Sequence, residues 1–263
     1  MERRHSAGGW DEKFGVSPMV ARSIPNLFTL GNLLLGVLAI LWTFQGRASE
    51  AVLLVFLAML LDGLDGRVAR ALNAQSEFGK ELDSLSDIVS FGVAPALIMY
   101  QSAFAWVEPA ALTWTVTAMF PICGALRLAR YNVRDGIPGY FVGLPIPAAG
   151  GVLAALAIFA EDLHVSLLML SMVALSLMMI STTKYPNFKK FGLPKPAVWA
   201  VPLVVAGAAV MAWLFPRGIP HVALAMLLVY ALWGFKRSVK RFFRRVRRRS
   251  FRAKEAEREH HSA

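Results

Sequence analysis

The chain has 263 residues, of which 56% are hydrophobic and only 17% are charged, and its formal net charge is +11. Soluble domains contain about 25% charged residues and disordered chains are poor in apolar ones, so the composition excludes both classes. The single cysteine, Cys123, excludes an intrachain disulfide framework. The excess positive charge indicates either nucleic-acid binding or orientation in a membrane, and the positions of the cations decide between them.

Apolar stretches long enough to cross a bilayer recur along the chain. A helix needs about 20 apolar residues to span the hydrocarbon core, and about 17 is near the lower limit. After a polar N-terminal tail, the pattern predicts eight spanning helices, at residues 24–44, 50–72, 78–105, 110–129, 144–160, 165–181, 197–215 and 219–235. We therefore predict an all-α polytopic membrane bundle with one embedded domain, residues 23–235, between tails at 1–22 and 236–263.

The lysines and arginines are sorted to one side of these predicted spans. All but two of the 28, Arg47 and Arg217, fall in the two tails, in alternate connections or at the span ends that adjoin those connections. Cytoplasmic loops are the ones enriched in basic residues, so eight spans with both termini in the cytoplasm satisfy the pattern. We expect an integral protein of a bacterial inner membrane with its basic face in the cytoplasm.

The C-terminal tail holds a large share of the positive charge. Residues 236–252 are strongly basic, and Val239, Phe242, Phe243 and Val246 follow helical spacing on one face. Such a helix lies in the membrane interface and is attracted to anionic lipids. Nucleic-acid binding is the weaker alternative, because the preceding span delivers this segment to the membrane surface, and we expect no nucleic-acid partner.

Four aspartates lie in or beside the second and third predicted spans. Asp62 and Asp65 share one helical face, and Asp83 and Asp87 share a face of the next helix. A carboxylate within a membrane segment is unfavourable by about 2.5–3.5 kcal/mol on insertion scales, so each is a functional candidate. The structural alternative is that these acids pair with Arg67, Arg70 and Lys80 at the membrane surface. Four converging carboxylates without histidine or cysteine favour a hard divalent cation, Mg²⁺, Mn²⁺ or Ca²⁺, over zinc.

The spacing of these acids and their neighbours is Asp62-x2-Asp65-Gly66-x2-Ala69-Arg70-x8-Gly79-x3-Asp83-x3-Asp87. It resembles the motif of the CDP-alcohol phosphatidyltransferase family. The resemblance implies that two divalent ions, Mg²⁺ or Mn²⁺, bind a CDP pyrophosphate, and that Asp62, Asp65, Asp83 and Asp87 are the metal ligands. It implies that Asp87 is also the general base. It places Gly66, Ala69, Arg70 and Gly79 on the nucleotide side, with Asn26 and Thr29 beside the cytidine; a capped, polar helix start is the alternative for the last two.

Flanking segments resemble the members of that family that use serine. They are IPNLFTLGNLLLG at 24–36, DIVSFGVAPAL at 87–97, LRLARYN at 126–132, GLPIPAAGG at 143–151 and YPNFKK at 185–190. The resemblance implies transfer of the phosphatidyl group from CDP-diacylglycerol to L-serine, with phosphatidylserine and CMP as products, and a possible homodimer. Cations available for the serine carboxylate are Arg127, Arg130, Lys184 and Lys189, each of which could instead be ordinary loop charge.

Two alternatives remain open at this point. Glycerol phosphate or inositol phosphate would also require cations, so the charge pattern alone does not select serine as the acceptor. An ion transporter with intramembrane acids is the non-enzymatic alternative. It is disfavoured because the aspartates lie toward the basic ends of their helices, whereas transport sites lie near the midplane.

Overall fold

The structure, a computed structural model, describes residues 18–72, 74–133 and 140–186. Its helices are α2 (Pro18–Phe44), α3 (Ala48–Ala71), α4 (Glu77–Asp87), η1 (Ile88–Val93), α5 (Ala94–Met99), η2 (Tyr100–Phe104), α6 (Ala110–Val133), α7 (Ile146–Ile158) and α8 (Val165–Ile180). Two short strands, β1 (Tyr140–Val142) and β2 (Lys184–Pro186), pair antiparallel. The N-terminal tail before Pro18, the seventh and eighth predicted spans and the basic C-terminal tail lie outside the described residues.

The helices of the described residues form six rods, because α4, η1, α5 and η2 follow one another without a break from Glu77 to Phe104. Each rod corresponds to one of the first six predicted spans. Three of them are long and apolar enough to cross a membrane, at Ser23–Phe44, Glu77–Phe104 and Ala110–Val133. The helical class of the prediction is confirmed for this part of the chain, and the β1–β2 pair is a small departure that hydropathy does not predict.

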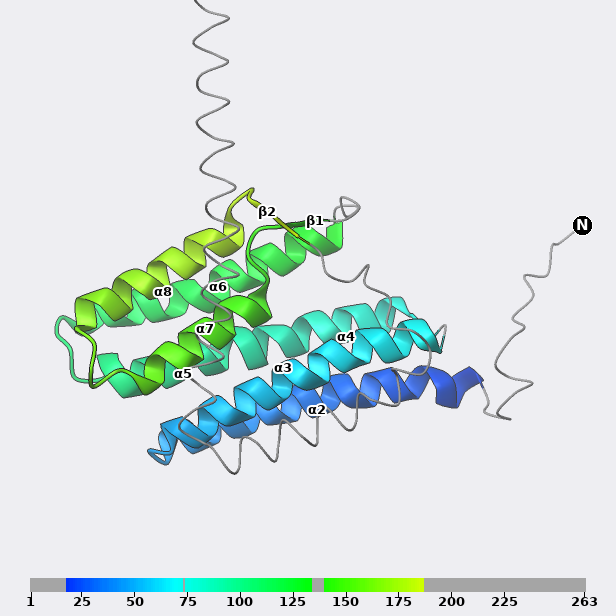
Figure 1. Cartoon of the computed structure of the whole chain (residues 1–263), viewed down its shortest axis with the longest axis horizontal. Helices are drawn as coiled ribbons and strands as arrows, with labels where there is room; N and C mark the ends of the chain where they lie inside the picture. Colours follow the sequence, from blue (N-terminus) through cyan, green and yellow to red (C-terminus); the bar gives the residue numbers. More distant parts are fainter. Residues whose placement is uncertain (1–17, 73, 134–139, 187–263) are drawn as a thin grey trace, which may run out of the picture.

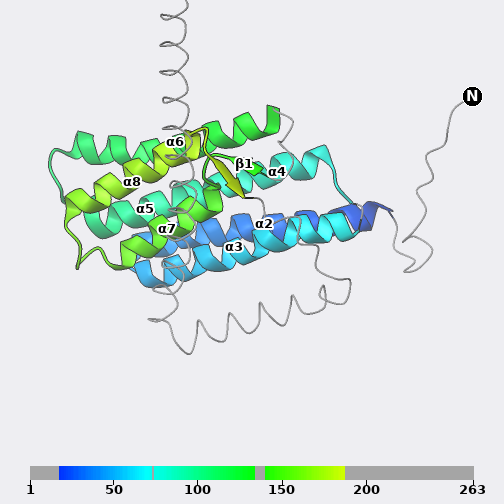
Figure 2. The ribbon, with the colours of Figure 1, turned by 45° about the horizontal axis from the view of Figure 1, so that its top comes forward.

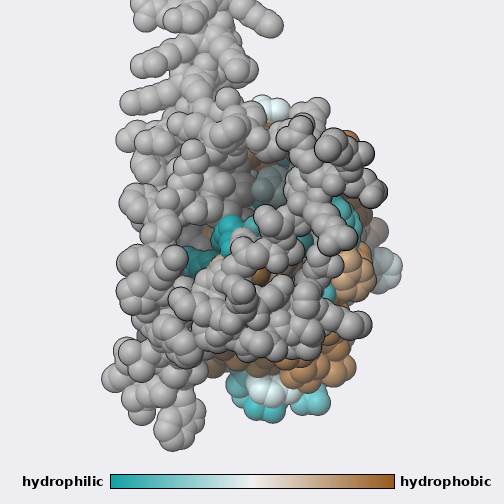
Figure 3. Space-filling model, turned by 90° about the vertical axis from the view of Figure 1, so that its right-hand side faces the viewer, coloured by the Kyte–Doolittle hydropathy of each residue, from teal (hydrophilic) through white to brown (hydrophobic). Residues whose placement is uncertain are grey.

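Successive rods run in alternating directions, as Figure 1 shows. The turn between α3 and α4, the start of α2, the last turn of α6 and both strands lie at one end of the bundle, which we call the aspartate end. The connections at 45–47, 105–109 and 159–164 lie at the opposite end. Hydrophilic side chains are visible at the aspartate end, beside hydrophobic side chains on the flank of the bundle (Figure 3).

The Glu77–Phe104 rod lies in the middle of the bundle, with α2 and α3 side by side along it and α6, α7 and α8 on the rest of its circumference (Figure 2). Its π-helical segment η1 contacts α2, α6 and α7. Two glycines allow these approaches: a Cβ at Gly36 of α2 would lie 2.3 Å from Ser90 Oγ, and one at Gly150 of α7 would lie 2.3 Å from the carbonyl oxygen of Phe91. The helix that carries Asp87 is therefore held between neighbouring backbones.

Burial follows the same arrangement. Fully buried large side chains, such as Phe91, Phe104 and Phe120, fill the space around the central rod. In contrast, α2 exposes a row of apolar side chains at alternating spacings of three and four: Leu27, Leu30, Leu34, Val37, Leu41 and Phe44. In a soluble protein such a row would be an unusual exposed patch, whereas on a membrane helix it is an ordinary lipid-facing surface.

Candidate active site

The connection between α3 and α4 brings the two aspartate pairs together. Ser76 is the N-cap of α4: it has extended backbone angles, and its hydroxyl accepts a hydrogen bond from the amide of Gly79 at 3.0 Å. Such a cap satisfies an amide at the start of the helix and fixes where the helix begins. The connection is short, α3 and α4 run antiparallel (Figure 1), and Asp62 of α3 lies near Asp83 and Asp87 of α4.

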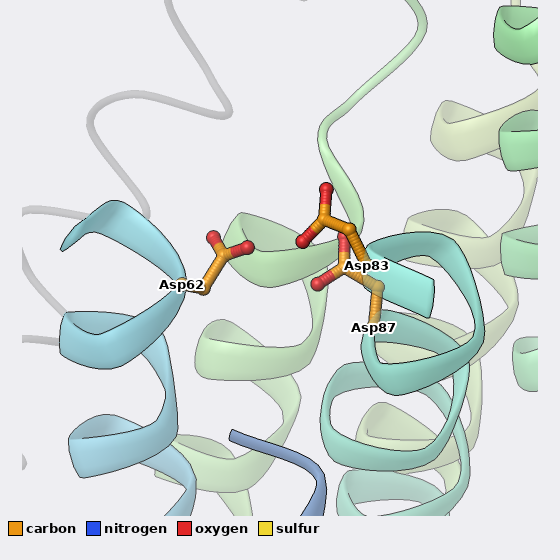
Figure 4. Close-up of side chains that lie close together, drawn as sticks. All are labelled: Asp62, Asp83 and Asp87. Atoms are coloured by element: carbon orange, nitrogen blue, oxygen red, sulfur yellow. The ribbon is translucent and has the colours of Figure 1, made fainter. Parts of the chain in front are cut away.

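Three of the carboxylates converge. Asp62 projects from α3 toward Asp83 and Asp87 on α4 (Figure 4), and one oxygen of each lies within 4.8 Å of the others. The side chain of Asp87 is 7% exposed, and its Oδ1 atom has no hydrogen-bond partner within the described part of the chain. Three hard oxygen donors at this spacing suit Mg²⁺ or Mn²⁺. The residues present therefore fit the divalent cation that the motif implies.

Asp65, the fourth predicted ligand, lies slightly apart from this group. It is buried, and its Oδ2 atom accepts a hydrogen bond from the Thr29 hydroxyl at 3.0 Å. Its Oδ1 atom accepts from the amide of Gly66. Asp65 is therefore oriented by α2 and by its own helix, and it remains close enough to interact electrostatically with Asp62 and Asp83.

The residues predicted for the nucleotide side lie around the same turn. The guanidinium of Arg70 passes over Gly66, where a Cβ would meet its Nη1 atom at 3.4 Å. A Cβ at Gly79 would lie 3.0 Å from Asn26 Oδ1 and 3.1 Å from Ser76 Oγ. Ala69 lies on α3, and its carbonyl accepts a hydrogen bond from the amide of Ala74 at 2.9 Å. The two glycines therefore keep space open beside an amide and a guanidinium.

The two arginines of α6 have different surroundings. Arg127 is buried, 6% exposed, and interacts electrostatically with Asp87. The Arg130 guanidinium instead donates hydrogen bonds to carbonyl oxygens of Ile180 at 2.8 Å, Ser181 at 3.2 Å, and Val142 and Met179 at 3.4 Å. Arg127 therefore lies within electrostatic reach of Asp87, whereas Arg130 holds the end of α8 and the end of β1.

The other two predicted acceptor residues are lysines, of which the structure describes one. Lys184 begins β2, and Lys189 lies outside the described residues. The strand pair brings the backbone of Lys184 next to Val142, at the aspartate end.

Two buried serines beside Asp87 are not among the residues predicted for the site. Ser86 and Ser90 are fully buried, and each donates a hydrogen bond to a backbone carbonyl of α2. A signal for them exists in the sequence, because hydroxyls at positions one before and three after an intramembrane aspartate are polar groups that must find partners.

The chain was also compared with known protein families and with curated proteins. The model of the family described as CDP-alcohol phosphatidyltransferase matches residues 22–183. The chain belongs to the CDP-alcohol phosphatidyltransferase family. It is therefore an integral membrane phosphotransferase, and the matched region begins in the second turn of α2 and extends past the end of α8.

Several curated members of the family are similar over most of the chain. A CDP-diacylglycerol–serine O-phosphatidyltransferase of Helicobacter pylori (strain ATCC 700392 / 26695) is 37% identical over 222 residues, covering 81% of this chain and 90% of the relative. The enzyme of that name from Bacillus subtilis is 40% identical, covering 64% of this chain and 92% of the relative. One from Methanocaldococcus jannaschii is 35% identical and covers 83% and 95%.

A CDP-alcohol phosphatidyltransferase must hold a charged diphosphate and a lipid at the same site. The described geometry has elements for both: a carboxylate cluster at the aspartate end, and apolar helix surfaces that extend from it along the bundle. A lipid substrate can thus lie against the bundle while its polar head reaches the aspartates.

Proposed function

We propose that this chain transfers the phosphatidyl group of CDP-diacylglycerol to the hydroxyl of L-serine, giving phosphatidylserine and CMP. The observation that carries the proposal is the convergence of Asp62, Asp83 and Asp87 at one end of a membrane bundle. Serine as the acceptor is supported by the names of three relatives, each of which aligns with this chain over 90% or more of the relative's own length.

We assign Asp62, Asp65, Asp83 and Asp87 as ligands of two divalent ions, Mg²⁺ or Mn²⁺. When bound, such ions neutralise the charge of the diphosphate and of the leaving CMP. The chain's own contribution is to hold four carboxylates on two antiparallel helices. Thr29 and Gly66 hold Asp65 through hydrogen bonds, and Asp62 extends across to the α4 pair.

We assign Asp87 as the general base. A serine hydroxyl is a weak nucleophile and requires a base within hydrogen-bonding reach. In this step the serine Oγ forms a bond to the phosphorus of the phosphatidyl group, and its proton passes to the Asp87 carboxylate. The bond from that phosphorus to the CMP oxygen breaks, and CMP leaves with its electron pair. The Oδ1 atom of Asp87, which has no partner in the described part of the chain, is available for the proton.

The CDP moiety is bound, in this proposal, around the α3–α4 turn. Gly66 and Gly79 leave space next to the helices, and Arg70 supplies a cation for a phosphate oxygen. Asn26 and the start of α2 border the cytidine, with Ala69 as a small side chain on the α3 face. The proximity of Asn26 to Gly79 supports placing the nucleotide there.

For the serine carboxylate we favour Arg127, because it is buried and interacts with the proposed base. Lys184 and Lys189 stay predictions from the sequence as further cations for that carboxylate. The contacts of Arg130 with four carbonyl oxygens favour a structural role for that residue instead.

We further propose that the aspartate end faces the cytoplasm of a bacterial inner membrane, since it carries the basic connections. Residues 23–235 then form the catalytic membrane domain. The basic segment 236–263 binds anionic lipid at the cytoplasmic surface, and two copies of the chain form a homodimer.

An acceptor assay tests the proposal. The purified full chain in nanodiscs receives CDP-diacylglycerol and Mn²⁺ or Mg²⁺, with serine, glycerol 3-phosphate or inositol phosphate in separate reactions. We expect CMP release and a new phospholipid with serine only, and complete loss of both after chelation of the metal. Turnover with a different alcohol would retain the family chemistry but refute serine, and no CMP with any acceptor would refute the enzyme.

A further inference from the structure

Two buried hydroxyls connect the helix that carries Asp87 to α2. Ser86 Oγ donates to the carbonyl oxygen of Thr29 at 3.0 Å, and Ser90 Oγ donates to that of Asn32 at 2.9 Å. Both serines are 0% exposed. We call Ser86 and Ser90 the serine pair.

These bonds are not the ordinary bonds of helical serines. A serine inside a helix commonly returns its hydroxyl to the carbonyl four residues earlier in its own helix. Ser176 of α8 does this, since its Oγ donates to the Met172 oxygen at 2.8 Å. The serine pair instead bonds to a neighbouring helix, which can accept because a carbonyl oxygen has two lone pairs.

The spacing of the four groups fixes the position of one helix along the other. The donors are four residues apart on one rod, and their acceptors are three residues apart on α2, so both pairs span about one helical turn. One hydrogen bond would leave the helix free to pivot around it. Two bonds a turn apart prevent both sliding and rotation, and Asp87 lies between the two donors in sequence.

The hydrogen bond of Ser90 also fixes the backbone that follows Asp87 to α2. The π-helical segment η1 begins at Ile88, directly after Asp87, and contains Ser90. Such segments often occur at functional sites. Gly36 lets α2 approach this segment closely, because a Cβ there would lie 2.7 Å from the Cα atom of Ser90. No side chain at that position separates Ser90 from α2.

Thr29 extends the connection to α3. Its carbonyl accepts from Ser86, and its hydroxyl donates to Asp65 Oδ2 at 3.0 Å. Thr29 thus contacts both Asp65 of α3 and Ser86, the residue before Asp87 on α4.

From these contacts we propose that Ser86 and Ser90 are positioning residues. They set the place of Asp87 relative to Asp62 and Asp83, and thereby the spacing of the carboxylates that receive the divalent ions. The inference rests on the proposed function for its catalytic consequence, while its effect on ion binding can be measured without substrate.

The test compares Ser86→Ala, Ser90→Ala and the double variant with the wild-type chain. Ser176→Ala is the matched control, because it also removes a fully buried hydroxyl, but from the bond within α8. Each full-length protein is placed in nanodiscs without substrate, and free Mn²⁺ is followed by electron paramagnetic resonance during a titration. We expect each single variant to weaken Mn²⁺ binding about 3- to 10-fold, and the double variant to weaken it further. The control should bind Mn²⁺ like the wild type.

Kinetics provide the second measurement. In the double variant the Mn²⁺ concentration for half-maximal CMP release should rise and kcat should fall, while KM for serine stays within about twofold of the wild-type value. Ser86→Cys and Ser90→Cys, which retain a weak donor of similar size, should fall between serine and alanine. This graded recovery would not arise from a merely misfolded protein.

Two results would overturn the inference. One is wild-type Mn²⁺ affinity in a folded double variant; the other is equal weakening in Ser176→Ala. A wild-type chain that binds Mn²⁺ but releases no CMP with serine would refute the proposed function alone, because the titration still judges the serine pair. If the alanine variants do not fold, the cysteine variants decide: unchanged Mn²⁺ affinity in both would refute the inference.

Discussion

The two ends of the bundle differ in how far their charged side chains are exposed to solvent. At the end opposite the aspartates, Arg47 Nε and Glu50 Oε1 form an ion pair at 3.1 Å, with side chains 46% and 44% exposed. The Arg47 guanidinium also lies over the Trp42 ring, 4.4 Å from its centroid. At the aspartate end, Asp65 and Asp87 are nearly inaccessible and adjoin further carboxylates.

Water stabilises the exposed charges of Arg47 and Glu50, whereas the buried charges of Asp65 and Asp87 must be stabilised by the fold or by a bound cation. An exposed ion pair contributes about 0.2–1 kcal/mol and can be replaced with little effect. Several buried carboxylates repel one another and lose hydration, so a fold that brings them together is unfavourable without a cation. Such an arrangement is consistent with selection for chemistry rather than stability, and substitutions at the two ends should reveal this.

The largest effect is expected for Asp87→Asn. It retains the size of the side chain but removes the proposed base and one metal ligand, so kcat should fall at least about 10²- to 10⁴-fold. Folding and binding of the CDP-lipid should persist. Rates of CMP release and direct binding of CDP-diacylglycerol measure the two properties. Asp162→Asn, an exposed acid at the opposite end, is the matched control, and near-normal turnover of Asp87→Asn would refute the base assignment.

Arg127 should give the next largest effect. Arg127→Met removes the buried cation that interacts with Asp87, and we expect KM for serine to rise about 10- to 100-fold. Arg127→Lys should lie between the two, since it retains charge but loses the bidentate geometry. Initial rates over a serine series measure this. An unchanged KM for serine in Arg127→Met would remove this residue from the acceptor site.

Arg130 lies one turn along the same helix, and it should behave differently. Arg130→Met leaves the last carbonyls of α8 and that of Val142 without their donor, so stability should fall by about 1.5–3 kcal/mol. KM for serine should not change in the folded fraction. Thermal unfolding in nanodiscs and the serine series separate these effects. A higher KM with unchanged stability would return Arg130 to the acceptor site.

Much of this arrangement can be predicted from the sequence, because helices that cross a membrane require long apolar runs that are easy to recognise. Six apolar runs predict the six described rods, and the spacing of Asp62, Asp83 and Asp87 on two helical faces predicts their convergence. Periodicity places side chains on faces, and a short connection fixes which faces meet. Those two rules are sufficient for the acidic cluster.

Other features depend on contacts between helices, which periodicity does not contain. Arg127 and Arg130 are three residues apart and are therefore predicted on one helical face, which suggests a common role. In the structure, however, Arg130 donates hydrogen bonds to carbonyl oxygens at the end of α8. The π-helical turn after Asp87 and the acceptors of Ser90 depend on how closely Gly36 lets α2 approach. The β1–β2 pair joins segments some 40 residues apart, over runs too short for a strand signal.

The smallest effect is expected at the exposed ion pair. Glu50→Gln should change the free energy of unfolding by less than about 1 kcal/mol, because the pair is solvated and Arg47 retains its contact with Trp42. The difference from wild type should shrink further at high salt, which screens exposed charges. Thermal unfolding at low and high ionic strength measures it, with CMP release expected at the wild-type rate. If Glu50→Gln reduced turnover, charge at the opposite end would be coupled to the acidic cluster, and the division between the two ends would not hold.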